Sequence, residues 1–180
     1  MKLENARILL TGAAGGLGSE LARQLTAAGS SLLLAGRNAK RLEALRETLG
    51  AKAAIVAADL TSTEGVAQTV RAAQAFNVNL LINNAGANSF GLLENQPWSS
   101  TAQVLAISLE APIHLTQALL PWLKALPQAA IVNIGSTFGS LPFPGFVAYS
   151  AAKAGLHGFS QALRRALADS LVSVMCIAPR

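Results

Sequence analysis

The alternation of short apolar runs with longer amphipathic stretches is the feature of this sequence that most restricts its fold. Six apolar runs predict β-strands at Ala6–Leu10, Ser31–Ala35, Ala53–Ala57, Asn79–Asn83, Ala130–Ile134 and Val172–Ile177. Helical periodicity predicts helices near Leu17–Ala28, Ala39–Leu49, Thr63–Phe76, Ser99–Leu126 and Ala148–Ala168. Strands that alternate with helices and are apolar on both faces are typical of buried parallel sheets. The sequence therefore predicts an α/β fold, a doubly wound parallel sheet in three α/β/α layers.

A single domain is expected over residues 1–180, because this length suits one compact unit. Hydrophobic residues make up 52% of the chain and charged residues 13%, which excludes an intrinsically disordered protein. The net charge is +5, but the basic residues form no run or stripe, so we expect no nucleic-acid partner. Small anionic ligands agree better with this charge.

Metal, disulfide and membrane functions find little support in the sequence. Cys176 is the one cysteine, so we expect no internal disulfide and no cysteine-based metal cluster, which agrees with a cytoplasmic location. His114 and His157 are far apart in the sequence and lack cysteine ligands, so no metal site is predicted. Glu4 and Arg7 interrupt any signal-peptide pattern, and we expect no membrane-spanning helix.

A glycine-rich turn follows the first predicted strand. Residues 11–18 read Thr-Gly-Ala-Ala-Gly-Gly-Leu-Gly and lead directly into the first predicted helix. Glycines let backbone amides approach a pyrophosphate closely, and the N-terminus of a helix offers unpaired N–H groups. The common G-x-G-x-x-G spacing and the Walker A pattern both fail here. We predict a phosphate-binding turn made by Gly12, Ala14, Gly16, Leu17 and Gly18; a purely structural turn is the alternative.

The end of the second predicted strand bears on the choice of dinucleotide. A site for NAD usually places an acidic residue there for the ribose 2′-hydroxyl, whereas a site for NADP uses arginine for the 2′-phosphate. No acid occurs between Leu32 and Ala39, and Arg37 lies in that interval. The sequence therefore favours NADP over NAD, with a solvated surface arginine as the alternative.

Tyr149, the one tyrosine, precedes Lys153 by four residues. Residues at i and i+4 share a helix face, so the phenol and the ammonium are expected side by side. A neighbouring cation stabilises the phenolate, which would make Tyr149 a general acid or base near neutral pH. Ser136, at the end of the fifth strand, could donate a hydrogen bond to a substrate carbonyl. A serine acyl enzyme built on Ser150 and Lys153 is disfavoured, because the Ser-Asp-Asn and Lys-Thr-Gly elements of such enzymes are missing.

In order and spacing these residues resemble the short-chain dehydrogenase/reductase family, and the resemblance covers the whole chain. The matching motifs are Thr11-Gly12-x-x-x-Gly16-x-Gly18, Asp59-Leu60, Asn83-Asn84-Ala85-Gly86, Ser136, Tyr149-x-x-x-Lys153 and Pro179. The resemblance implies a Rossmann-type fold. It also implies an oxidoreductase that transfers hydride between a nicotinamide cofactor and a carbonyl or secondary-alcohol substrate.

The resemblance also implies roles for the matching residues. Tyr149 would exchange a proton with the substrate oxygen, Ser136 would polarise that oxygen, and Lys153 would assist Tyr149 and bind the nicotinamide ribose. The implied cofactor contacts outside the glycine turn are Asp59 and Leu60 at adenine, Asn84, Ala85 and Gly86 at the adenosine ribose, and Pro179. A helix-capping role for Asp59 and a turn-forming role for Asn84 are the alternatives.

The sequence departs from the family at two places. Ser108 stands where the family usually carries a catalytic asparagine, so we take Ser108 as a candidate catalytic residue. Pro112 follows four residues later and has no N–H for the Ser108 carbonyl, which leaves backbone that could hold a relay water. Members of the family usually continue past the sixth strand with a substrate-covering segment and a seventh strand. We therefore expect a sheet without its seventh strand and a chain truncated at the C-terminus.

Two function classes remain in competition. The first is an NADP-dependent oxidoreductase acting on a small-molecule carbonyl or alcohol, and the second is a non-catalytic nucleotide-binding or scaffold homologue. Apolar residues of two long loops suggest a hydrophobic substrate body or a simple cover for the sheet: Leu92, Leu93, Phe138, Leu141, Phe143 and Phe146. The fourth predicted helix carries few charges, and its apolar residues spread around the cylinder. We therefore expect a homodimer through the fourth and fifth helices.

Overall fold

The computed structural model describes residues 2–179, in which six parallel strands form one sheet. The strand order is β3-β2-β1-β4-β5-β6, so the direction of winding reverses between β1 and β4. The strands are β1 (Arg7–Thr11), β2 (Ser31–Gly36), β3 (Ala53–Ala57), β4 (Leu80–Asn83), β5 (Ala129–Ile134) and β6 (Val172–Ile177). All six predicted strands are confirmed, with ends that differ by at most one residue. Ligands of such sheets bind at the carboxyl ends of the strands, where the winding reverses.

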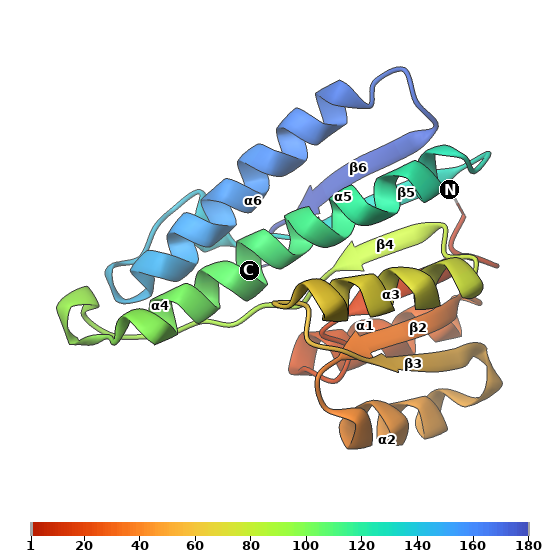
Figure 1. Cartoon of the computed structure of the whole chain (residues 1–180), viewed down its shortest axis with the longest axis horizontal. Helices are drawn as coiled ribbons and strands as arrows, with labels where there is room; N and C mark the ends of the chain where they lie inside the picture. The colour runs from red at the N-terminus through yellow and green to blue at the C-terminus, as the bar shows by residue number, and fades with distance from the viewer. Residues whose placement is uncertain (1, 180) are drawn as a thin grey trace.

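Helices cover both faces of the sheet (Figure 1). On one face lie α1 (Gly16–Ala27) and α2 (Ala39–Leu49), and on the other lie α3 (Thr63–Ala75), α5 (Ala111–Lys124) and α6 (Val147–Ala166). A shorter helix, α4 (Trp98–Leu105), leads into α5 through a π-helical segment, η3 (Ala106–Glu110). Short 3₁₀ turns complete the chain: η1 (Gly50–Lys52), η2 (Leu93–Asn95), η4 (Thr137–Gly139) and η5 (Pro144–Phe146). The predicted doubly wound α/β fold is confirmed.

The long predicted helix from Ser99 to Leu126 is interrupted by η3. The backbone N–H of Ala111 donates to the carbonyl of Ala106, five residues back, which is the hydrogen bond of a π-helix. Pro112 cannot donate a backbone hydrogen bond, so the regular α-helical ladder cannot continue through this position. The π segment widens the helix beside the cavity described below.

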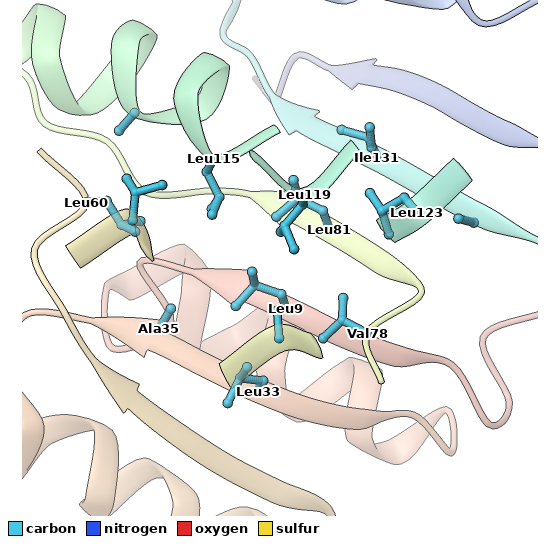
Figure 2. Packing of buried hydrophobic residues seen from close by; sticks show 14 of the residues in the cluster. Leu9, Leu33, Ala35, Leu60, Val78, Leu81, Leu115, Leu119, Leu123 and Ile131 are labelled. Carbon is cyan, nitrogen blue, oxygen red and sulfur yellow. The ribbon is translucent and has the colours of Figure 1, made fainter. Parts of the chain in front are cut away.

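The inner face of α5 holds the larger half of the core together. Leu115, Leu119 and Leu123 are completely buried, and Figure 2 shows them reaching the sheet around Leu81 and Ile131. Full burial of one leucine contributes about 1.5–3 kcal/mol. These three leucines form one stripe at i, i+4 and i+8. Ile113, Leu120 and Trp122 lie outside that stripe and are partly buried, so the apolar residues of this helix extend beyond its core-facing side.

The outer face of α5 is less apolar than the sequence suggests. His114, Gln117, Ala118 and Pro121 are exposed there. The continuous helical run from Trp98 to Lys124 is nevertheless long and apolar enough to cross a membrane by length and composition alone. It contains Glu110 and Lys124, and the expectation that it does not span a membrane stays a prediction. The criteria are met because the run combines the core-facing leucines with an outer face that carries few charges.

A chain of buried amides and hydroxyls joins the elements that carry the site. The side-chain amide of Asn83 in β4 donates to Thr116 Oγ1 in α5 at 3.1 Å and to Asn133 Oδ1 in β5 at 2.8 Å. The amide of Asn133 donates in turn to Ser160 Oγ in α6 at 2.8 Å. Because buried polar groups are costly when unpaired, this chain fixes the position of α6 against β5.

Candidate functional site

The glycine turn is held in a conformation that larger residues could not adopt. Gly12 has a φ of +64°, and a Cβ placed on it would lie 2.8 Å from the Cα of Ala85. A Cβ on Gly18 would lie 2.2 Å from the carbonyl oxygen of Gly12, so Gly18 allows α1 to begin directly against the turn. Gly16, by contrast, has open space at its Cβ position. The turn is therefore packed on its inner side and open on its outer side.

Thr11 and Asn84 join the glycine turn to the segment that follows β4. Thr11 Oγ1 accepts hydrogen bonds from the backbone N–H groups of Asn84 at 3.0 Å and Ala85 at 2.9 Å. The Asn84 amide donates back to the carbonyl of Thr11 at 2.9 Å. The Asn84 side chain thus braces the turn, and Asn84 also borders the cavity.

A cavity of about 560 Å³ opens at the carboxyl ends of the strands. It brings together most of the predicted site residues: Gly12, Ala14, Gly16, Leu17, Arg37, Leu60, Asn84, Ala85, Gly86, Ser136, Tyr149, Lys153 and Pro179. Three predicted residues do not line it. Gly18 lies behind the turn, Asp59 borders a neighbouring hollow, and Ser108 is buried.

The cavity also contains residues that the sequence interpretation missed: Asn38, Arg41, Asn88 and Ile107. Arg41 follows Arg37 by four residues, in the first turn of α2, and this spacing is the signal that could have revealed it. The Asn38 side chain accepts a hydrogen bond from the Arg41 backbone N–H at 3.0 Å, so Asn38 caps α2. Within residues 2–179, the charged side chains that line the cavity are Arg37, Arg41 and Lys153, all basic.

Asp59 has a local structural role. Its carboxylate accepts hydrogen bonds from the backbone N–H of Thr61 at 3.0 Å and from Thr61 Oγ1 at 2.8 Å. These bonds, the backbone one first, hold the pKa of Asp59 below its ordinary value. Asp59 shares its hollow of about 420 Å³ with Arg37, beside the main cavity. The predicted contact of Asp59 with adenine stays a prediction.

Lys153 is the most unusual ionisable group of the site. It is only 4% exposed, and Nζ donates a hydrogen bond of 2.7 Å to the carbonyl of Ile134 at the end of β5. Burial lowers the pKa of Lys153 to about 8, with a small opposing effect from Cys176. A Cβ on Gly139 would lie 2.8 Å from the carbonyl carbon of Lys153, so α6 approaches the loop after β5 closely.

Tyr149 and Ser136 face the same cavity as Lys153. Lys153 Nζ lies 5.6 Å from the centre of the Tyr149 ring, which confirms that the i, i+4 spacing brings the two side chains together. Ser136 Oγ accepts a hydrogen bond from the Phe138 backbone N–H at 3.2 Å. Its own proton is available for a ligand, so the cavity offers a hydroxyl donor, a phenol and an ammonium in one place.

Ser108 binds backbone instead of facing the cavity. It is completely buried in η3, and its Oγ accepts from the backbone N–H of Ala87 at 3.2 Å and donates to the carbonyl of Ala87 at 3.0 Å. These two bonds fasten the π segment to the strip formed by Gly86 and Ala87. The geometry therefore gives Ser108 a positioning role, and a direct part in catalysis stays a prediction.

The cavity fits a nicotinamide dinucleotide. The cap of α1 is Gly15, which has no side chain to satisfy the first N–H groups of the helix. Those groups are free to bind phosphate oxygens, and helix N-termini favour anions. Gly16 leaves open space on the same side of the turn. The cavity extends from there past Arg37 on one side and to Tyr149 on the other, so it suits an elongated ligand.

Comparisons with known proteins agree with this geometry. The family model for short chain dehydrogenases matches residues 6–180. Nodulation protein G of Rhizobium sp. (strain N33) is 34% identical over 180 residues, which cover 99% of this chain and 74% of that protein. Dehydrogenase/reductase SDR family member 7B of Mus musculus is 36% identical over 186 residues, covering 98% of this chain and 58% of that protein.

A solved structure gives the same answer for the fold. A short-chain dehydrogenase from Streptomyces avermitilis superposes with a TM-score of 0.92 at 30% sequence identity, covering 98% of this chain and 65% of that one. This chain therefore spans slightly less than two thirds of the solved structure that it matches. The motifs, the sheet order and the family match lead to one conclusion: the chain belongs to the short-chain dehydrogenase/reductase family of oxidoreductases.

Proposed function

We propose that this protein is an NADP(H)-dependent oxidoreductase that interconverts a carbonyl compound and the corresponding secondary alcohol. The observation that carries the proposal is the single cavity lined both by the glycine turn with Arg37 and by Ser136, Tyr149 and Lys153. The first group suits the phosphates of a dinucleotide, and the second suits a reacting carbonyl. A nicotinamide bound between them would supply or accept the hydride.

The side chains divide the remaining chemistry between them. Ser136 donates a hydrogen bond to the substrate oxygen, and Tyr149 Oη gives its proton to that oxygen during reduction or takes it during oxidation. The Lys153 ammonium, 5.6 Å from the centre of the Tyr149 ring, would stabilise negative charge on Tyr149 Oη during proton transfer and would donate to the ribose of a bound nicotinamide nucleotide. Pro112 offers the Ser108 carbonyl no N–H, so a water bound at this backbone of η3 would provide a route by which protons return to Tyr149.

The preference for NADP(H) rests on the charge of the cavity wall. Arg37 and Arg41 border it on the side of α2, and among residues 2–179 no carboxylate lines it. Arginine forms strong charge-assisted hydrogen bonds with phosphate, whereas the 2′-hydroxyl of NAD would find no acceptor carboxylate here. Asp59 is engaged by Thr61 in the neighbouring hollow.

The reaction is tested by following NADPH oxidation with a panel of ketones and aldehydes. Replacing Tyr149 with phenylalanine retains the ring beside Phe146 but removes the transferable proton. Turnover should fall by about 10²–10⁴-fold while NADPH binding, measured by calorimetry, is unchanged. Undiminished turnover in Tyr149→Phe would contradict the mechanism. Nucleotide binding with no turnover of any carbonyl would favour the non-catalytic alternative.

The proposal also covers the kind of substrate, the location of the protein and its oligomeric state. The two loops beside Ser136 and Tyr149 expose apolar side chains, so the substrate carries a hydrophobic group; Leu92 is 60% exposed and Leu141 is 77% exposed. We place the protein in the cytoplasm as a homodimer. Its interface would use the outer faces of α5 and α6, where small residues such as Ala118, Ala154 and Gly158 are exposed.

A further inference from the structure

The loops after β4 (residues 84–97) and β5 (residues 135–146) both begin at the cavity and are joined to each other farther along. The backbone N–H of Gly91 donates to the carbonyl of Gly145 at 3.0 Å. A Cβ on Gly145 would lie 2.3 Å from Phe90 Cε2, so the Phe90 ring rests directly on the Gly145 backbone. Gln96 secures the first loop, because its side chain accepts from Ser89 Oγ at 2.7 Å and donates to the Gly91 carbonyl at 3.1 Å. The two loops therefore form one unit.

Four phenylalanines of this unit form an aromatic wall, which we define as Phe90, Phe138, Phe143 and Phe146. Phe146 is at its centre: its ring centre lies 5.2 Å from those of Phe90 and Phe138 and 6.1 Å from that of Phe143. Phe146 also meets the Tyr149 ring edge-on, at 6.2 Å and 61°. The wall is thus continuous with the side chain that exchanges the proton.

The wall keeps much of its apolar surface free. Phe90 is 71% exposed and Phe143 is 49% exposed, although both touch other rings. The wall residues do not line the cavity themselves and connect to it through the contact of Phe146 with Tyr149. Exposed aromatic rings favour a ligand that stacks on them with a face or an edge. A substrate with its carbonyl at Ser136 and Tyr149 would extend its remaining atoms along these rings.

The charge pattern of the loops restricts the substrate further. No lysine, arginine, aspartate or glutamate occurs between Lys124 and Lys153, and the first loop contains only Glu94. The loops therefore offer no cation for a carboxylate or phosphate on the substrate, and burying an unpaired charge there would be costly. The loops therefore favour an uncharged substrate.

We propose that the aromatic wall selects uncharged carbonyl compounds with an aromatic ring near the carbonyl carbon, and that Phe90, positioned by Gly145, determines this specificity. The inference rests on the proposed function, because it assigns the substrate class of the same site. Gly145 acts as a positioning residue: its missing side chain is the space that the Phe90 ring occupies.

Two variants and a control test the proposal with acetophenone and butan-2-one as probes and NADPH as reductant. Phe90→Ala removes the exposed ring, and Gly145→Ala displaces it without deleting it. Both should lower kcat/KM for acetophenone by roughly three- to tenfold and leave butan-2-one within about twofold. Leu171→Ala, which removes a 65% exposed leucine before β6, is the control and should leave kcat/KM for both ketones unchanged. Circular dichroism checks that the variants fold.

A binding measurement separates this inference from the reaction itself. Saturation-transfer NMR on the NADP⁺ complex should show strong transfer to the acetophenone ring protons, reduced in Phe90→Ala and in Gly145→Ala. Ring binding of this kind without turnover of either ketone would support the proposed role of the aromatic wall and would contradict the proposed reaction. Turnover with an acetophenone preference that neither variant changes would overturn the wall and leave the reaction standing. Absence of both binding and turnover would overturn both.

Discussion

Lys153 shows how a single residue can carry a function at the expense of stability. Its ammonium is almost fully buried, and Ile134 supplies the one carbonyl acceptor described for it. Removal from water disfavours the charged form, so the pKa falls from 10.5 to about 8. The protein tolerates this cost where a cation beside Tyr149 is useful.

Lys153 should make stability increase with pH in the alkaline range. Between pH 8 and 10.5 the unfolded chain keeps a proton that the folded chain has released, so folding becomes more favourable as pH rises. From about pH 7.5 to 9.5 the free energy of unfolding should rise by about 1–2 kcal/mol more in the wild type than in Lys153→Met. Urea denaturation at each pH measures the free energy of unfolding of both proteins. The control is Lys124→Met at an exposed lysine, and equal pH slopes in all three proteins would contradict the prediction.

At the scale of the element, the first turn of α2 adds a second arginine to the wall of the proposed cofactor site. The Asn38 cap begins this helix immediately after Arg37, which places Arg37 and Arg41 along the same side of the cavity. The guanidinium groups of these two arginines offer both positive charge and N–H donors to an anion. The end of β2 and the start of α2 therefore act together.

Arg37→Asp should reverse the preference between the dinucleotides. Loss of the phosphate contact and repulsion by the new carboxylate should weaken NADP⁺ binding roughly ten- to a hundredfold, with NAD⁺ binding little affected. Arg41→Ala should shift the ratio in the same direction by less. Titration calorimetry measures both affinities. Arg46→Ala, in the last turn of α2 and paired with Glu43, is the control. An unchanged ratio in Arg37→Asp would show that the 2′-phosphate lies elsewhere.

Strands and helices whose apolar residues recur at regular spacing were predictable from the sequence. Segments whose conformation depends on tertiary contacts were not. The strands followed from apolar runs, and the helix ends agreed within two residues, as at Val147–Ala166. The π segment depends on Pro112 together with the bonds between Ser108 and Ala87, which are 21 residues apart. The direction of the leucine stripe of α5 depends on where the sheet lies.

The residues of the candidate site likewise fall into those that the sequence predicts and those that only the tertiary structure reveals. Tyr149, Lys153 and Ser136 were predictable because helix spacing and strand ends bring them together. Ser108 was expected to face the reaction, but a serine hydroxyl is short enough to be satisfied by one neighbouring peptide group, here that of Ala87. Arg41 does not follow from the strand-end rule, because it reaches the cavity from the first turn of α2 and not from the end of β2.

For the whole molecule, the outer faces of α5 and α6 are where we predict assembly. A Cβ on Gly158 meets no atom within 4 Å, so a larger residue fits the isolated subunit. Gly158→Glu should therefore convert a dimer to a monomer that still folds, since its Cβ position is open space in its own subunit and glycine inside a helix is itself unfavourable. Light scattering after gel filtration measures the mass. Ala75→Glu on α3 should remain dimeric, and a monomeric wild type would contradict the prediction.

The reversal of strand order between β1 and β4 has a consequence for cooperativity. The cavity takes Gly12, Arg37 and Leu60 from one half of the sheet and Tyr149 and Pro179 from the other. A dinucleotide that fills the cavity couples the stability of the two halves of the sheet, because opening either half releases the ligand. At a hundred times its Kd, NADP⁺ should add about 2.7 kcal/mol to the stability of both halves. Amide hydrogen exchange should then slow to a similar extent in β3 and β6, whereas protection confined to one half would mean that each half can open without the other.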